Sequence, residues 1–297
     1  MRAVQGSDRH EVVALMRDGR QVRRGLRWAD TAASSLAGPY SVEGRALVDR
    51  VPFIWLDRQD GREVVRLRTF KPDLMLVGNF GVILREAILD VPSVGTVNTH
   101  WSLLPLHRGP HPSTSVLLEG DDTTGLTFHV VNKRIDAGDI LDQVAFGVQP
   151  DDTATSIYHR AVDLAGARIV ALLDRIDKDG LKGTPQDLSQ GSYHRRPTVQ
   201  RATLDFERPA EELDRVVRAL IRPMARFRCG GRTVYVSSAR VVSDVHAEPG
   251  TVVQRSPKVV VATGEGGLAL DVCYQLAPVP APWPAPWNRV SVGTVLR

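Results

Sequence analysis

Short apolar stretches alternate with amphipathic stretches over the first half of the chain. The apolar stretches are rich in branched residues and bounded by turn formers, a pattern that predicts β-strands. We place these strands at Val12–Met16, Pro52–Leu56, Leu74–Gly78, Val94–Val97, Leu126–Val131 and Ile140–Val148. Apolar residues at helical spacing between them predict helices near residues 62–70, 83–90 and 112–119. The alternation is typical of an α/β domain with a mostly parallel, Rossmann-like sheet.

The second half of the chain begins with a long amphipathic helix, which the apolar spacing predicts from Thr153 to about Ile176. A polar segment without a regular apolar pattern follows it. We interpret residues 186–203 as a linker between a catalytic domain, residues 1–185, and a C-terminal domain, residues 204–297. The smaller domain is expected to contain a helix over residues 209–221 and a small open barrel, with strands near 233–242, 251–253, 259–263 and 268–274.

Composition narrows the class of protein. The chain has 297 residues, of which 42% are hydrophobic and 24% charged, as in ordinary soluble proteins. It has neither an apolar run long enough to cross a membrane nor the core of a signal peptide. Cys229 and Cys273 form no disulfide framework, and no zinc spacing occurs, so we expect a cytoplasmic protein without a metal site. The net charge of +4 suits an anionic partner without identifying it.

Three polar residues stand in apolar or turn-forming surroundings. Asn98 and His100 are two residues apart at the end of the strand at Val94–Val97, so their side chains should point to one side. Asp136 follows the next strand, in a loop where an Ala-Gly pair allows a ligand to approach the backbone. Ligands bind at the carboxyl ends of strands in open α/β sheets. These residues are therefore candidates for a catalytic centre.

Acyl transfer to an amine would need these three groups. The attack of a nitrogen on a formyl carbonyl creates negative charge on oxygen and positive charge on nitrogen. The amide of Asn98 and a protonated His100 could donate hydrogen bonds to the oxygen. Asp136 would raise the pKa of His100, orient its ring and accept the proton from nitrogen. Taken singly, each residue is more often structural, because Asn and Asp beside Gly usually form turns.

The motif Asn98-Thr-His100 followed by Ser102-Leu-Leu-Pro105 and the loop Asp136-Ala-Gly-Asp139 resembles the 10-formyltetrahydrofolate-dependent formyltransferases. These include methionyl-tRNA formyltransferases and the N-formyltransferases of sugars and natural-product amines. The family's catalytic Asn, His and Asp correspond to Asn98, His100 and Asp136, and the separation of 36 residues between His and Asp agrees (136 − 100 = 36). The resemblance implies the formyltransferase fold with an OB-like C-terminal domain, and 10-formyltetrahydrofolate as formyl donor.

The resemblance also implies two binding regions. The donor site is expected to involve Phe80, Gly81, Val82, Ile83, Leu84, Arg134, Ile135, Ala137, Gly138 and Asp139. The acceptor side is expected to involve Trp101, Ser102, His107, Arg108 and His111. Two alternatives stay open: the segment at 80–84 could be a strand-to-helix turn, and Trp101 could turn into the core.

The chain departs from the tRNA-formylating members at acceptor-facing positions. Leu106-His-Arg-Gly-Pro-His-Pro112 replaces their usual Trp-Arg-Gly-Ala-Ala-Pro and is nearer to the sugar and natural-product enzymes. At the N-terminus, ten mostly polar residues stand where the family has a strand, a turn and a helix. Either the start codon is set too late or the sheet lacks a strand, and we favour the first.

The leading interpretation is therefore formyl transfer to the amine of a small or carrier-bound acceptor, such as an amino-sugar nucleotide, an amino acid or a natural-product precursor. The alternative is a methionyl-tRNA formyltransferase, with tRNA ranked behind small amines. A non-catalytic folate-binding protein and a formyl-folate hydrolase are further alternatives. Arg215, Arg218 and Arg222 share one helix face, which we interpret as solvated surface before nucleic-acid contact. The sequence leaves the oligomeric state open.

Overall fold

The computed structural model describes residue 4 and residues 6–18, 41–256, 258–276, 279–282 and 291–296. The chain forms two compact units, each assembled from three stretches of sequence. Unit 1 consists of Met1–Pro110, Gly125–Ala145 and Arg160–Tyr193, and unit 2 of His111–Thr124, Phe146–His159 and His194–Arg297. The division between domains expected at residues 186–203 stays a prediction. None of the helices in these described ranges is both long enough and apolar enough to cross a membrane.

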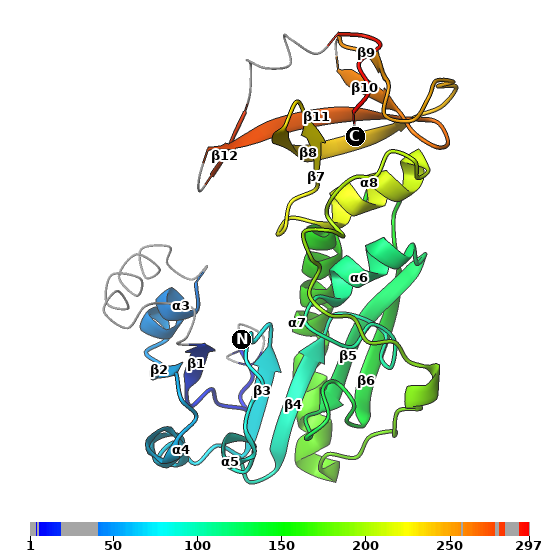
Figure 1. Cartoon of the computed structure of the whole chain (residues 1–297). Helices are drawn as coiled ribbons and strands as arrows, with labels where there is room; N and C mark the ends of the chain where they lie inside the picture. The colour runs from blue at the N-terminus through cyan, green and yellow to red at the C-terminus, as the bar shows by residue number, and fades with distance from the viewer. Residues whose placement is uncertain are drawn as a thin grey trace. The chain divides into compact units, whose positions relative to one another are not determined.

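Unit 1 is rich in parallel strand pairs, as the sequence predicted, and these pairs lie in two separate sheets (Figure 1). Its main sheet has the order β3 (Leu74–Gly78), β4 (Gly95–His100), β5 (Thr123–Val130) and β6 (Ile140–Gly147). β3 and β4 are parallel, whereas β4 and β5 are antiparallel. β1 (Leu15–Asp18) and β2 (Phe53–Leu56) form a second, parallel pair.

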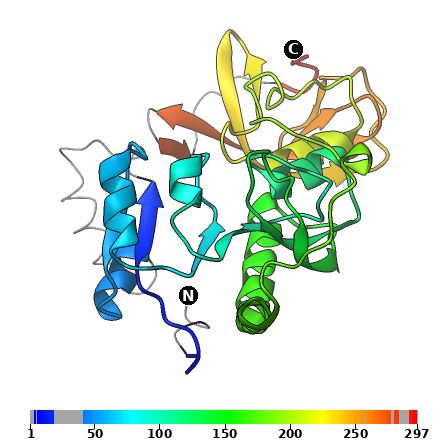
Figure 2. The ribbon, with the colours of Figure 1, turned by 90° about the horizontal axis from the view of Figure 1, so that it is seen from below.

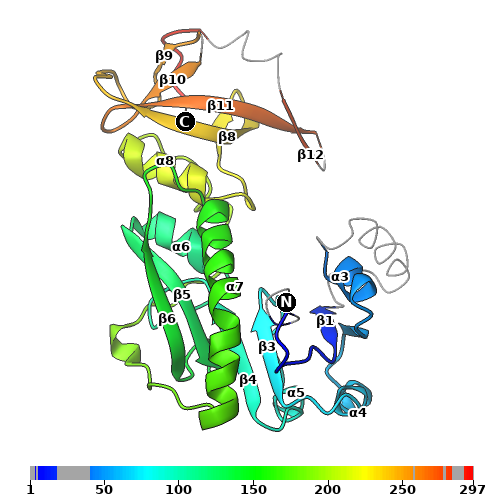
Figure 3. The same ribbon diagram turned by 180° about the vertical axis from the view of Figure 1, so that it is seen from behind.

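One face of the main sheet is covered by a long helix, α7 (Ala154–Asp179), which passes in front of the sheet in Figure 3 and is seen almost end-on in Figure 2. Val97 of β4 and Phe128 of β5 pack there against Leu172 of α7, in a core of fully or almost fully buried side chains. Burial of such side chains contributes about 1.5–3 kcal/mol each to stability. The opposite face of β4 and β5 is therefore left for polar residues.

A second core joins β2 and β3 to two short helices. α4 (Gly61–Arg68) and α5 (Glu86–Leu89) contribute Leu67 and Ile88, and α3 (Val42–Val48) precedes β2 in the chain. α4 begins at Asp60, whose carboxylate accepts hydrogen bonds from the first-turn N–H groups of Arg62 and Glu63.

Unit 2 contains an antiparallel half-barrel of six strands, which agrees with the small barrel predicted for the C-terminal part. The order is β7 (Arg226–Cys229), β8 (Arg232–Val242), β11 (Gly267–Leu276), β10 (Val259–Ala262) and β9 (Val252–Gln254), with β12 (Val279–Pro282) paired to β11. The amphipathic helix α8 (Ala210–Ala219) packs Leu213 and Val216 against Val236 and Leu268 of the sheet. α6 (Pro112–Glu119) joins the same core through Val116 and Leu117.

The differences between the predicted and the observed helices and strands concern mainly the short elements. β3 has the predicted bounds, but β7 and α3 were not predicted, and α5 is half the expected length. β7 has the sequence Arg-Phe-Arg-Cys, so only Phe227 gives an apolar signal. Its place is determined by main-chain pairing with β8, which a single-sequence pattern does not reveal.

Candidate active site

The polar face of the main sheet carries the candidate catalytic residues. Asn98 and His100 point to this face from β4, as their spacing predicted. Asn98 is directly opposite His129 of β5, and His100 is opposite Thr127. Cross-strand partners project to the same side of a sheet. Four polar side chains from two strands therefore gather on the face that α7 does not cover.

The His100 ring is almost fully buried, with 4% of its surface exposed. Its Nε2 lies 2.9 Å from the carbonyl oxygen of His107. A carbonyl oxygen only accepts, so Nε2 carries the hydrogen. Nδ1 then faces Asp136, with 3.7 Å between Nδ1 and Oδ1.

These surroundings correct one expectation about His100. Burial lowers its pKa, and this effect outweighs the carboxylate of Asp136 and the His107 carbonyl, both of which raise it. Asp136 acts in the expected direction, but the net shift is downward. His100 is therefore a neutral imidazole at neutral pH, and not the protonated oxyanion donor that the sequence suggested.

Asp136 sits at the bend of its loop in the left-handed conformation, with φ of 49°. Its Oδ2 accepts a hydrogen bond from the Gly109 N–H at 2.8 Å, and its Oδ1 lies 3.7 Å from His129 Nε2. Burial alone would raise the pKa of the carboxyl. The side chains of His129 and His100 and the hydrogen bond from the Gly109 N–H together outweigh burial, so the pKa is lowered. Asp136 is therefore ionised at neutral pH.

His129 is a residue of this centre that the sequence reasoning missed. It is 2% exposed, its Nδ1 donates to the Val130 carbonyl oxygen at 2.9 Å, and its Nε2 lies 3.1 Å from Nδ2 of Asn98. Because Nδ1 carries the ring hydrogen, Nε2 accepts from the Asn98 amide. This contact fixes the amide orientation and leaves its second N–H for a ligand. His129 is the one ionisable residue of strand β5, and this was the available signal.

The two segments expected to bind the donor lie in unit 1. Phe80 and Leu84 pack against the core of β2 and β3, whereas Ile83 is 72% exposed. Gln59 fixes this segment from both sides: its Nε2 donates to the Ile83 carbonyl oxygen at 3.0 Å, and its Oε1 accepts from the Arg85 N–H at 2.6 Å. The segment is thus a braced turn with an exposed apolar side chain.

The second segment follows β5 and includes Asp136. Arg134 and Ile135 are exposed, Ala137 and Asp139 are half-buried, and Gly138 is buried. A Cβ atom on Gly138 would lie 1.8 Å from the Val130 carbonyl oxygen, so only glycine fits there. The close approach of these two backbones holds Asp136 at the end of β5.

The residues expected on the acceptor side fall into three groups. Ser102 and His107 are buried, and the Ser102 hydroxyl donates to the Leu106 carbonyl oxygen. Trp101 is half-buried and packs against the core under α7, which favours its structural interpretation. Arg108 is half-buried in unit 1, while His111 begins unit 2. Their binding roles stay predictions.

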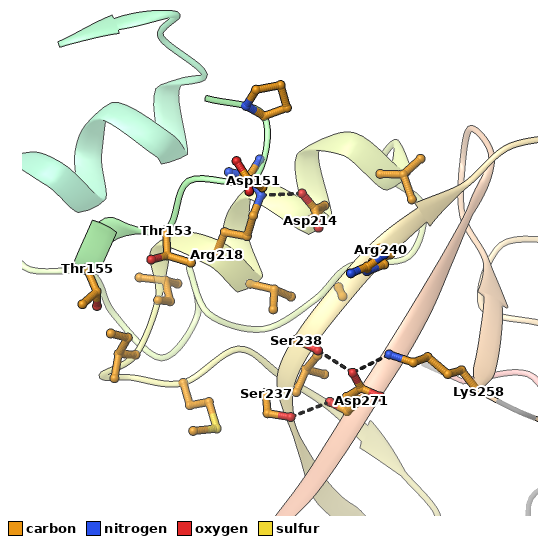
Figure 4. A pocket seen from close by; sticks show the side chains of 18 residues that line it. Asp151, Thr153, Thr155, Asp214, Arg218, Ser237, Ser238, Arg240, Lys258 and Asp271 are labelled. Carbon is orange, nitrogen blue, oxygen red and sulfur yellow. Dashed lines mark hydrogen bonds and ion pairs between the residues drawn. The ribbon is translucent and has the colours of Figure 1, made fainter. Parts of the chain in front are cut away.

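Unit 2 contains a half-open cavity of about 800 Å³ between the start of α7, α8, β8 and β11 (Figure 4). Most of its charged groups bind each other. Arg218 pairs with Asp214 at 2.6 Å and donates to the Asp152 carbonyl oxygen, and Lys258 pairs with Asp271 at 2.6 Å. Arg218, expected on a solvated stripe, is therefore an internal cross-link of unit 2.

Two parts of the chain match known protein families. Residues 57–173 match the family described as Formyl transferase, and residues 198–276 match the Formyl transferase, C-terminal domain. The methionyl-tRNA formyltransferase of Nitrosomonas europaea is 30% identical over 268 residues, covering 88% of this chain and 80% of that protein.

Solved structures show the same fold. HypX from Aquifex aeolicus in complex with tetrahydrofolic acid aligns with a TM-score of 0.66 at 17% identity over 91% of this chain. The chain spans only 45% of the length of HypX. The N-formyltransferase from Helicobacter canadensis, in complex with folinic acid and dTDP-3-aminofucose, aligns with a TM-score of 0.60 at 17% identity, covering 77% of this chain and 81% of that one. The chain therefore belongs to the formyltransferase family, enzymes that transfer a formyl group from 10-formyltetrahydrofolate, as its sequence motifs predicted.

Proposed function

We propose that this enzyme transfers the formyl group of 10-formyltetrahydrofolate to the amino group of methionyl-tRNA. One observation carries this choice of acceptor. The similarity to a methionyl-tRNA formyltransferase extends over 88% of the chain, and the match to the family's C-terminal domain covers residues 198–276. This reverses the ranking that the acceptor-facing residues alone suggested. A cytoplasmic location is part of the same proposal.

The donor is held by the two braced segments of unit 1. Ile83 and Ile135 are 72% and 42% exposed, and such apolar surface beside open backbone suits a flat pterin ring. When bound, the donor supplies a formyl carbonyl attached to a leaving nitrogen. The fixed turn at Gln59 and the close approach of Gly138 to Val130 keep the two segments in place before the donor arrives.

Asn98, His100 and Asp136 carry out the transfer. The second amide N–H of Asn98 donates to the formyl oxygen as negative charge develops there, while His129 holds the amide by the first N–H. The unprotonated Nδ1 of neutral His100 accepts the proton from the attacking amine. Asp136, ionised and 3.7 Å away, stabilises the resulting imidazolium. The imidazolium then returns the proton to the leaving nitrogen of the donor as the bond between that nitrogen and the formyl carbon breaks.

A small amine is the second candidate acceptor, favoured by the residues that differ from tRNA-formylating enzymes. The segment Leu106–Pro112 lacks their usual aromatic residue. In addition, Arg218 is engaged by Asp214 and the Asp152 carbonyl, so it is not available to bind a phosphate. These two observations concern the acceptor alone and leave the transfer chemistry unchanged.

An acceptor competition tests the proposal. Purified enzyme, 10-formyltetrahydrofolate and either methionyl-tRNA, amino-sugar nucleotides or amino acids are incubated at low and moderate salt, and formylated products are identified by mass spectrometry. We expect formylmethionyl-tRNA, with kcat/KM falling steeply as salt rises, because phosphate contacts release counterions. Formylation of a small amine alone, at a rate independent of salt, would establish the second candidate. Formate as the only product would indicate hydrolysis of the donor.

A further inference from the structure

The segment Thr184–Tyr193, named here the strap, runs beside the catalytic loops at the end of unit 1. Sequence patterns assigned most of it to a linker, because it lacks apolar periodicity. In the structure its main chain is anchored at both ends. Thr184 exchanges two hydrogen bonds with Ile140, at 2.8 and 2.9 Å, and Arg108 forms a bridge with Tyr193.

Gln186 of the strap fixes the loop that carries Asp136. Its Nε2 donates to the carbonyl oxygens of Asp136 at 3.1 Å and of Gly138 at 2.6 Å. Since both partners only accept, the amide nitrogen must face them. One side chain thus binds the backbone on either side of Ala137. This holds Asp136 in its left-handed conformation, which side chains rarely adopt.

Ser192 of the strap fixes the loop that binds His100. Its hydroxyl accepts from the His107 N–H at 2.8 Å, and its carbonyl oxygen accepts from the Arg108 N–H at 3.0 Å. A Cβ on the preceding Gly191 would lie 2.6 Å from the Pro105 carbonyl oxygen, so the two backbones meet here. The loop in turn binds His100 through the His107 carbonyl and Asp136 through the Gly109 N–H.

We propose that Gln186 and Ser192 are positioning residues that set the separation of His100 and Asp136 for catalysis. Each contacts a different loop: Gln186 binds the loop that carries Asp136, and Ser192 binds the loop whose His107 carbonyl holds the His100 ring. Neither residue touches the reacting atoms. The expected loss of kcat rests on the proposed function. The expected change in the separation of His100 and Asp136 does not, because it can be measured without an acceptor.

The kinetic test compares Gln186→Ala and Ser192→Ala with Gln190→Ala, a matched control. Gln190 is an exposed residue of the strap, and no side-chain hydrogen bond of it is found among the described residues. We expect kcat to fall roughly 10- to 100-fold for Gln186→Ala, because small misplacements of catalytic groups have such effects. Ser192→Ala should show a smaller loss, and Gln190→Ala none. The donor dissociation constant should be unchanged in Ser192→Ala and Gln190→Ala, and in Gln186→Ala it should change much less than kcat, although the loop that Gln186 fixes also borders the proposed donor site.

The geometric test follows the titration of His100 by NMR in the ligand-free protein. His100 faces Asp136, His129 and His107, and its pKa is raised by the Asp136 carboxylate and by the hydrogen bond to the His107 carbonyl, whereas the charges of His129 and His107 lower it. Releasing the Asp136 loop should therefore move the His100 pKa further down in Gln186→Ala and leave it unchanged in Gln190→Ala. An unchanged His100 titration in folded Gln186→Ala, or equal loss of kcat in the Gln190 control, would overturn the proposal. If Gln186→Ala does not fold, Ser192→Ala decides by the same readouts. If wild-type enzyme formylates no amine, the proposed function fails, but the titration still tests the strap.

Discussion

The Nε2 atom of His100 donates to the carbonyl oxygen of His107, 2.9 Å away, and this contact determines the chemistry available to the ring. With the hydrogen on Nε2, the free lone pair of Nδ1 faces Asp136. A neutral histidine and an ionised carboxylate side by side form an acceptor pair for a proton. The pair suits an incoming amine, which must lose a proton as its bond to the formyl carbon forms.

Asn98 should be the main donor to the formyl oxygen, with His129 as its support. We expect Asn98→Ala to reduce kcat roughly 100- to 1,000-fold, the range seen when one oxyanion donor is removed. His129→Leu leaves the amide in place but frees its rotation, so its loss should be about tenfold. Single-turnover rates at saturating donor measure both effects. A larger loss for His129→Leu than for Asn98→Ala would mean that His129 itself contacts the reacting groups.

The activity should fall on the acidic side of neutrality. His100 has a pKa below the ordinary histidine value of 6.5 because of burial, and the neutral ring is the active form. After correction for protonation of the acceptor's own amine, kcat/KM should therefore stay constant as the pH falls through 6.5 and decline only at a lower pH, as the ring becomes protonated. A pH–rate profile of the wild-type enzyme measures this. A midpoint clearly above 6.5 would contradict a neutral His100.

Folding stability, like activity, should decrease as the pH falls below the ordinary histidine pKa. The unfolded chain binds a proton at the ordinary histidine value of 6.5, and folded His100 binds it only at lower pH. The contribution of His100 is therefore fully present above 6.5 and is lost as the pH falls through that value toward the folded pKa. Denaturant unfolding of wild type and His100→Gln at several pH values isolates it, since the variant should lack this part of the pH dependence.

Gly138→Ala should displace the loop that carries Asp136. The added Cβ would lie 1.8 Å from the Val130 carbonyl oxygen, so the loop must move. We expect a destabilisation of roughly 1–3 kcal/mol, typical of overpacking, together with a severe loss of kcat. Gly147→Ala is the control, because its Cβ would lie at ordinary contact distance from its neighbours, 3.7 Å from the end of the Gln149 side chain and 3.9 Å from the Asp122 carbonyl oxygen. Thermal unfolding and turnover of both variants provide the comparison.

Arg218 should matter for the stability of unit 2 more than for binding. Its guanidinium is largely buried and holds Asp214 and the Asp152 carbonyl oxygen. Arg218→Ala should lower the free energy of unfolding by roughly 1–3 kcal/mol, as expected for charged hydrogen bonds. Arg222→Ala should not, because Arg222 is exposed and lies beyond the end of α8, and not on the helix face that the sequence predicted. If both variants fold with wild-type stability but bind methionyl-tRNA more weakly, these arginines contact RNA after all.

The sequence predicted those parts of the fold that have a strong apolar period. β3 has the predicted bounds, and α7 and α8 differ from prediction by a few residues. Both helices were recognisable because apolar residues, such as Leu172 in α7 and Leu213 in α8, recur along them at helical spacing. β7 was missed because Phe227 is the one strongly apolar residue in it. Its position depends on hydrogen bonds to β8, which are not encoded in a local pattern.

Only those site residues that belong to the sequence motifs could be predicted. Asn98, His100 and Asp136 come together as their order and spacing indicated. His129 required the register of β4 against β5, and Gln186 required the path of an irregular segment. The protonation state of His100 depends on burial by distant parts of the chain, so the sequence suggested the wrong charge. Roles that depend on tertiary contact were thus not accessible from sequence alone.

The most direct test of the account is a single-turnover assay with enzyme-bound 10-formyltetrahydrofolate and methionyl-tRNA, comparing wild type with Asp136→Asn. The account predicts formylmethionyl-tRNA from the wild type, and the same product roughly 100- to 10,000-fold more slowly from the variant, because the variant lacks the charge that stabilises protonated His100. Donor affinity should be the same in both. Equal transfer rates for the two proteins, or no formylated product from the wild type, would contradict it.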